Sequence, residues 1–202
     1  MMKLTPLAAV CLLATAASMP ATAHESVYRA NLSGPAEAPP NASPGFGTAT
    51  VTLDFDLFTM RVETSFSGLL GPVTAAHLHC CTAVPGAGTV GVASVTPSFT
   101  GFPIGATSGS YDHTYDMTAL GSYSAGFLAA HGGTASTAFN ALNLGLFGGQ
   151  AYLNVHTRAF PGGEIRGFLA FAPPVPEPST YAMMLGGLGL AAFAARRRCA
   201  TA

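Results

Sequence analysis

Two consecutive runs of two-residue alternation, residues 47–57 and 58–67, constrain the fold of this chain more than any other feature of the sequence. Gly47 to Leu57, GTATVTLDFDL, alternates Thr or Asp with Ala, Val, Leu and Phe. Successive side chains of a strand point to opposite faces, so the pattern predicts a strand with one polar and one apolar face. Phe58 to Ser67, FTMRVETSFS, alternates in the same way, and we expect it to pair with its predecessor as an antiparallel neighbour.

The rest of the central region predicts further short strands and little helix. The additional strands are Val27 to Ser33, Ala75 to Cys81, two short pieces around Val90 to Val95 and Phe99 to Ile104, and Ser110 to Met117. Ser122 to His131 and Thr134 to Phe147 instead have apolar residues near helical spacing, with Ser122 and Thr134 as N-caps. We therefore predict an all-β domain, an antiparallel β-sandwich or flattened barrel of the Ig-like or Greek-key type, with one or two short helices.

A hairpin is predicted near the end of this region. Ala151 to Thr157 favours one strand, Pro-Gly-Gly makes a turn, and Glu164 to Phe171 favours the second strand. Three charged side chains lie near the turn in a chain that is only 8% charged: Arg158, Glu164 and Arg166. We predict a structural role for them, an ion pair between Glu164 and an arginine that sets the hairpin register. No nucleophile elbow or partnered carboxylate accompanies Glu164, so we expect no enzyme.

The two ends of the chain resemble targeting segments. Met1 to Ala23 has an early lysine, an apolar run and a small-residue cleavage site, which predicts a signal peptide cleaved after Ala23. The predicted domain, residues 24–172, holds four arginines and eight acidic residues, a formal charge of −4. Nucleic acid is excluded as a partner, because its phosphate backbone requires a basic surface.

Residues 173–202 combine a proline-rich spacer, an apolar run and three arginines. This order resembles the PEP-CTERM sorting signal, with Pro176, Glu177 and Pro178 matching its motif. The resemblance implies processing by an exosortase-type membrane enzyme in a Gram-negative bacterium, often one that makes exopolysaccharide. Before processing we expect the apolar run to enter the membrane as a helix. A simple C-terminal anchor with a positive-inside stop is the alternative.

Histidines and cysteines suggest a metal site. In a strand, His77 and His79 project to the same face, and Cys80 and Cys81 add soft ligands nearby. If the hairpin pairs beside this strand, His156 completes a set of three, with Asn154 on the same face, and copper or zinc is the natural ion. The alternative is that these histidines are structural and bind the backbone, Thr157 or Glu164. The two cysteines can instead form a disulfide with each other or remain free thiols.

The same motifs carry a family resemblance. Tyr-Leu-Asn-Val-His-Thr at residues 152–157, Pro-Gly-Gly-Glu-Ile-Arg-Gly at residues 161–167 and Ala-His-Leu-His at residues 76–79 resemble the motifs of the CHRD domain. The resemblance covers roughly Glu25 to Phe171. It implies a β-sandwich or barrel-like domain, a location outside the cytoplasm and no established catalytic activity.

Two functions follow as expectations. The first is a non-enzymatic, exported protein of the cell surface or extracellular matrix, processed at its PEP-CTERM signal, whose domain binds exopolysaccharide or other matrix components. The second is a copper- or zinc-binding or redox protein, dismutase-like, that uses His77, His79 and His156.

Overall fold

Antiparallel strands dominate the computed structural model of the chain, which describes residues 24–173 and 178–199. The predicted signal peptide lies outside the described residues. The elements are β1 (Glu25–Ser33), η1 (Gly34–Ala36), β2 (Phe46–Asp54), β3 (Thr59–Ser67), β4 (Val73–His79), β5 (Gly109–Asp116), η2 (Leu120–Ser122), α2 (Ala125–Ala130), α3 (Ala135–Phe147), β6 (Tyr152–Thr157), β7 (Ile165–Phe168), β8 (Ala170–Phe171) and α4 (Pro178–Cys199).

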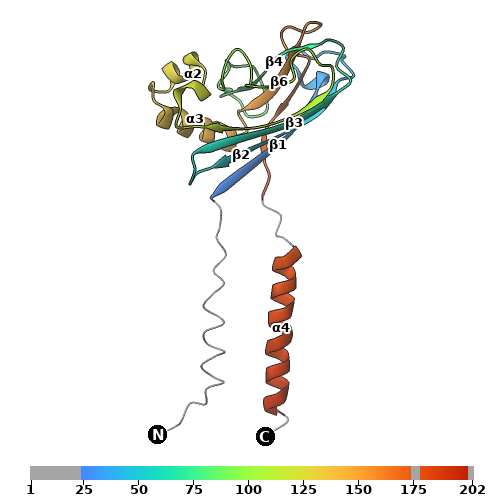
Figure 1. Cartoon of the computed structure of the whole chain (residues 1–202), viewed down its shortest axis with the longest axis vertical. Coiled ribbons are helices and arrows are strands. Elements are labelled where there is room, and N and C mark those ends of the chain that lie inside the picture. Colours follow the sequence, from blue (N-terminus) through green and yellow to red (C-terminus); the bar gives the residue numbers. More distant parts are fainter. Residues whose placement is uncertain (1–23, 174–177, 200–202) are drawn as a thin grey trace.

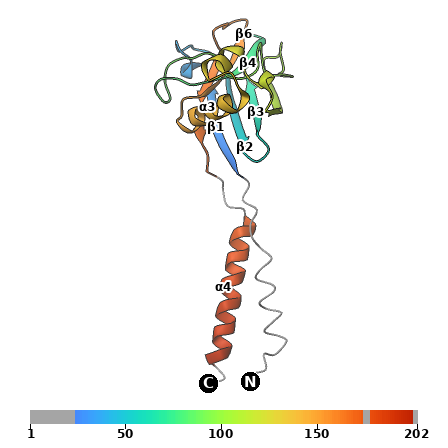
Figure 2. The ribbon, with the colours of Figure 1, turned by 90° about the vertical axis from the view of Figure 1, so that its left-hand side faces the viewer.

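The strands form one curled sheet. Its order is β4-β6-β7-β1-β2-β3-β5, and β8 pairs with β1 beside this path. All strand pairs are antiparallel. Figures 1 and 2 show the sheet curled into a half-barrel, with α2 and α3 on one side of it. The all-β prediction with few short helices is confirmed.

The alternation of β2 and β3 produces a buried face as predicted. Ala49, Val51 and Leu53 of β2 are buried, and the two threonines between them are half-buried. Val51 lies opposite Val62 of β3, which is also buried. The two strands therefore present one apolar face together, because directly opposite residues of an antiparallel pair share a face.

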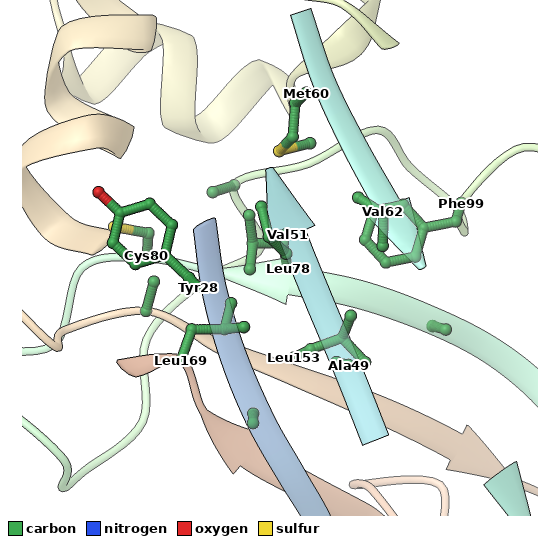
Figure 3. Close-up of a cluster of buried hydrophobic side chains, with 14 of the residues drawn as sticks. Tyr28, Ala49, Val51, Met60, Val62, Leu78, Cys80, Phe99, Leu153 and Leu169 are labelled. Atoms are coloured by element: carbon green, nitrogen blue, oxygen red, sulfur yellow. The ribbon is translucent and has the colours of Figure 1, made fainter. Parts of the chain in front are cut away.

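The hydrophobic core collects side chains from distant strands and from α3. Figure 3 shows Tyr28, Val51, Leu78 and Leu153 converging from β1, β2, β4 and β6. From α3 the core takes Phe139, Leu142 and Leu146, all buried. The spacing of these three residues matches one face of a helix, so α3 packs as an amphipathic helix.

The helices begin close to the predicted positions. Thr134 caps α3 as predicted, since its side chain accepts a hydrogen bond from the N–H of Thr137. Ser122 does not cap α2, because it belongs to η2. The N-cap is Ser124, whose hydroxyl accepts from the N–H of Phe127.

The two strands predicted around Val90 to Val95 and Phe99 to Ile104 are wrong. Residues 90–105 form turns with isolated bridges, and we call this segment the cover loop. It follows the free edge of β4 through four backbone hydrogen bonds: Ala93 N and Ser94 N to Leu78 O at 2.8 and 3.2 Å, Phe99 N to Ala76 O at 3.0 Å and Gly105 N to Val73 O at 2.8 Å. Glycines and prolines interrupt a regular ladder here, since proline lacks an N–H and both residues favour turns.

The predicted hairpin forms and lies beside β4. β6 pairs with β7 on one side and with β4 on the other. The second strand is shorter than predicted, because Glu164 precedes it and Leu169 separates β7 from β8. This pairing brings the histidine motifs of β4 and β6 together.

The tail ends in α4, which Figure 1 shows apart from the sheet. From residue 182 to residue 193 every side chain is exposed. The sequence predicts a membrane-entering helix in this tail. Among the helices of residues 24–173 and 178–199, none combines the length and the apolar character needed to cross a bilayer.

Candidate metal centre

Register places three histidines on one face of the sheet. His77 lies opposite Asn154, and Ala75 lies opposite His156. His77, His79 and His156 therefore project to the same side of β4 and β6, away from the core residues Leu78 and Leu153. The condition on which the three-histidine hypothesis depended, pairing of the hairpin beside β4, is met.

Each imidazole is fixed by one backbone carbonyl. The pairs are His77 Nε2 with Pro97 O at 2.6 Å, His79 Nδ1 with Val90 O at 2.8 Å and His156 Nδ1 with Pro161 O at 2.8 Å. A carbonyl oxygen only accepts hydrogen bonds, so the ring nitrogen that faces it carries the proton. The opposite nitrogen of each neutral ring then has a free lone pair.

These three lone-pair nitrogens converge. His77 Nδ1, His79 Nε2 and His156 Nε2 are buried and have no hydrogen-bond partner. One ligand atom from each ring lies within 4.8 Å of the others. Metal-binding histidines commonly donate their second N–H to a carbonyl, which fixes the tautomer and the ring orientation. The arrangement therefore has the geometry of a three-nitrogen metal site.

Burial keeps the three rings neutral. His77 and His79 are 8% and 9% exposed. Burial lowers the pKa of His79 to about 4, although its bond to Val90 O acts in the opposite direction. Burial also lowers the pKa values of His77 and His156. At neutral pH all three imidazoles are therefore in the deprotonated form that binds metals.

The cysteines do not join this cluster. Cys80 and Cys81 are linked to each other by a disulfide, and in this state neither sulfur is a thiolate ligand. Both sulfurs contact α3, since a Cβ placed on Gly145 would lie 2.2 Å from each of them. Among the described residues, the group that could hold an ion consists of His77, His79 and His156.

The predicted ion pair of Glu164 with an arginine is wrong. Glu164 is fully buried and accepts hydrogen bonds from the hydroxyls of Ser43 and Thr157 and from the N–H groups of Leu70 and Gly71. These four donors hold the carboxylate, and no cation of the described residues forms an ion pair with it. The donors Leu70 and Gly71 lie more than 90 positions before Glu164, so the hairpin sequence alone does not indicate that they bind its carboxylate.

The two arginines have other positions. Arg158 is exposed, and its backbone N–H donates to Pro72 O. Arg166 is buried, with its Nε 3.8 Å from an oxygen of Glu37. Its guanidinium also lies over the ring of Tyr152, 4.9 Å from the ring centre.

A buried carboxylate that binds Asn154, that of Glu37, was missed from the sequence. Asn154 Nδ2 donates to Glu37 Oε1 at 2.9 Å, and both residues are buried. Burial raises the pKa of Glu37 to about 7, against the opposing effects of the Arg166 charge and the Asn154 hydrogen bond. Glu37 lies in a proline-rich loop, and no pattern in that loop indicates that its carboxylate turns inward.

The sorting motif is only partly described. Pro176 and Glu177 lie outside the described residues, and Pro178 is the first residue of α4.

Comparison with known families gives two matches. The sequence profile of the CHRD domain matches residues 28–169, and that of the PEP-CTERM protein-sorting motif matches residues 174–198. No curated protein and no solved structure matches the chain.

Proposed function

The chain belongs to the CHRD domain family, and from this premise we propose that its domain is a metal-binding module of the cell envelope. The PEP-CTERM match identifies the chain as an exported protein of a Gram-negative envelope, whose signal exosortase processes. The proposal concerns what the exported domain does. Copper and zinc are the proposed ions, because both accept imidazole nitrogen.

One observation carries the proposal: His77, His79 and His156 each offer one ligand nitrogen within 4.8 Å of the others, and each ring has a buried nitrogen without a hydrogen-bond partner. A buried polar atom without a partner costs about 1–3 kcal/mol. Purely structural histidines give no reason for three such atoms to face one another. A bound ion satisfies all three lone pairs at once, and this favours metal binding over a structural role.

Elemental analysis of the full chain, purified without a histidine tag, tests the proposal. We expect near-stoichiometric copper or zinc, which a triple variant His77→Ala, His79→Ala, His156→Ala no longer binds. His113→Ala is the matched control, because His113 lies on β5, outside the cluster. Absence of metal in the unmodified chain, even after exposure to both ions, would refute the proposal. The dismutase-like alternative applies only if the ion is copper.

A second proposed function is binding or structural support in the extracellular matrix. It is supported by the sorting signal and by the family match. Retention of the purified chain on isolated exopolysaccharide, compared with retention of an unrelated acidic protein, tests it. Equal retention of the two proteins would argue against a specific matrix role. Metal binding and matrix binding are compatible with each other.

A further inference from the structure

A fourth unpartnered atom belongs to Asn154, the residue directly opposite His77. Five buried side-chain atoms among the described residues have no hydrogen-bond partner: His77 Nδ1, His79 Nε2, His156 Nε2, Asn154 Oδ1 and Thr64 Oγ1. Four of the five belong to β4 and β6. Native proteins satisfy most buried polar groups, so such a cluster requires an explanation. A metal ion accounts for the nitrogens but leaves the oxygen of Asn154.

The register fixes where Asn154 stands. It is the direct antiparallel partner of His77. Directly opposite residues have Cβ atoms about 4.5–5.5 Å apart and share a face of the sheet. Asn154 is 2% exposed, so its amide has no access to bulk water. Its side chain therefore lies at the edge of the three-histidine cluster.

The orientation of the amide is fixed by Glu37. Asn154 Nδ2 donates to Glu37 Oε1 at 2.9 Å, so the nitrogen side of the amide faces Glu37 and Oδ1 faces elsewhere. Gly163 closes over this pair: a Cβ there would lie 2.2 Å from Asn154 Nδ2 and 2.6 Å from Glu37 Oε1. The chain adopts a φ of +132° at Gly163, which favours glycine. The amide is thus held with a free acceptor.

We propose that Asn154 is a positioning residue that holds a protonated small ligand, such as water, on the metal by accepting its hydrogen at Oδ1. The inference rests on the proposed metal site. Three histidines leave a fourth position in a tetrahedral centre, which water or another exogenous ligand fills. An acceptor beside that position favours ligands that carry a hydrogen and disfavours anions that carry none. Asn154 thereby determines which ligands the metal retains.

Pulsed electron paramagnetic resonance on the unmodified, Cu(II)-loaded full chain tests this without any mutation. We expect a strongly coupled proton of a bound water that disappears on exchange into D₂O. Absence of a strongly coupled exchangeable proton overturns the inference; the imidazole N–H protons that face the carbonyls also exchange, but they lie farther from the copper and couple only weakly. Strong coupling to the side-chain carbon of ¹³C-labelled asparagine also overturns it, because Asn154 would then be a direct ligand.

Azide binding provides a second test. Azide has no hydrogen to donate, so Asn154 does not stabilise it, whereas Asn154 does stabilise the bound water that azide must displace. We therefore expect Asn154→Leu to bind azide roughly fivefold more tightly than the unmodified chain, because the water of the variant lacks one neutral hydrogen bond. Thr64→Val is the matched control, because it removes the unpartnered atom that lies elsewhere, on β3. Equal azide affinities of Asn154→Leu and the unmodified chain contradict the inference. Elemental analysis of the same samples shows whether the ion is bound. Equal azide affinities with the ion bound contradict the role of Asn154, whereas absence of the ion contradicts the proposed metal site itself.

Discussion

Glu164 is a buried carboxylate held by hydrogen bonds alone. It accepts from Ser43, Thr157, Leu70 and Gly71, two of which donate through backbone N–H groups. Burial acts to raise its pKa, but the hydrogen bonds outweigh burial and hold the pKa below its ordinary value. This residue therefore ties the hairpin to the two loops that supply its donors, and its chemistry can be tested by single substitutions.

We predict that Glu164→Gln destabilises the fold by about 2–4 kcal/mol, because the new NH₂ group faces donors and leaves them unpaired. Urea denaturation measures the free energy of unfolding. Glu63→Gln is the matched control: the Glu63 carboxylate lies 3.0 Å from Arg61, and its side chain is 40% exposed. An exposed pair of this kind contributes about 0–1 kcal/mol. Similar losses in the two variants would contradict the role assigned to Glu164.

The same carboxylate predicts acid sensitivity. Since the folded-state pKa of Glu164 lies below its ordinary value of 4.5, ionised Glu164 stabilises the folded protein. This contribution to the free energy of unfolding is complete above pH 4.5 and is lost as the pH falls through the lower folded-state value. We expect the unmodified chain to lose stability more steeply than Glu164→Gln below that pH. Histidine titration is common to both proteins, so parallel curves of urea midpoint against pH would contradict the prediction.

At the scale of elements, α3 approaches the Cys80–Cys81 disulfide at Gly145. A Cβ at Gly145 would meet both sulfurs at 2.2 Å, and the backbone at this position is helical. Glycine lowers helix stability by about 1 kcal/mol relative to alanine, so its presence here reflects close packing and not helix propensity. The contact sets how closely the helix lies to the end of β4.

We predict that Gly145→Ala destabilises the domain by about 1–3 kcal/mol, because the added methyl group must displace either the disulfide or α3. Gly126→Ala in α2 is the matched control, since a Cβ at Gly126 meets nothing within 4 Å. For that variant we expect no loss, or a gain of less than about 1 kcal/mol from helix propensity. Thermal unfolding of both variants measures the difference. A neutral Gly145→Ala would show that the sulfurs shift without cost.

The sequence predicted the regular elements better than the contacts between them. Two-residue alternation identified β2, β3 and β5, and Thr134 marked the start of α3. The cover loop was misjudged because its apolar residues suggest strands, while glycines and prolines prevent a ladder. The convergence of His77, His79 and His156 was predicted only conditionally, since local sequence does not specify which strand lies next to β4. Glu37 was missed for the same reason: its partners lie more than 100 positions away.

At the scale of the whole molecule, the proposed metal site joins β4, near the cover loop, to the C-terminal hairpin. Val90 and Pro97 of the cover loop and Pro161 of the hairpin loop fix the ligand rings. An ion that binds only the folded chain stabilises it, by about 2.7 kcal/mol at a free concentration 100 times Kd. We predict a rise in the unfolding temperature on adding Cu(II) or Zn(II) to the metal-free chain. The triple histidine variant should show no rise, and an equal rise in that variant would indicate binding elsewhere.

The last prediction concerns the division between domain and tail. Ala172 N donates to Val27 O at 2.8 Å, so the chain remains attached to β1 up to this residue. Deleting residues 173–202 removes the PEP-CTERM match and leaves the strands and the histidine cluster intact. We expect the truncated chain to leave the envelope fraction and appear in the medium, with its free energy of unfolding unchanged within about 0.5 kcal/mol. Fractionation of cells that express each form, followed by denaturation of the purified proteins, measures both quantities. Unchanged fractionation would argue against a sorting role for the tail, and a large loss of stability would show that the tail packs on the domain.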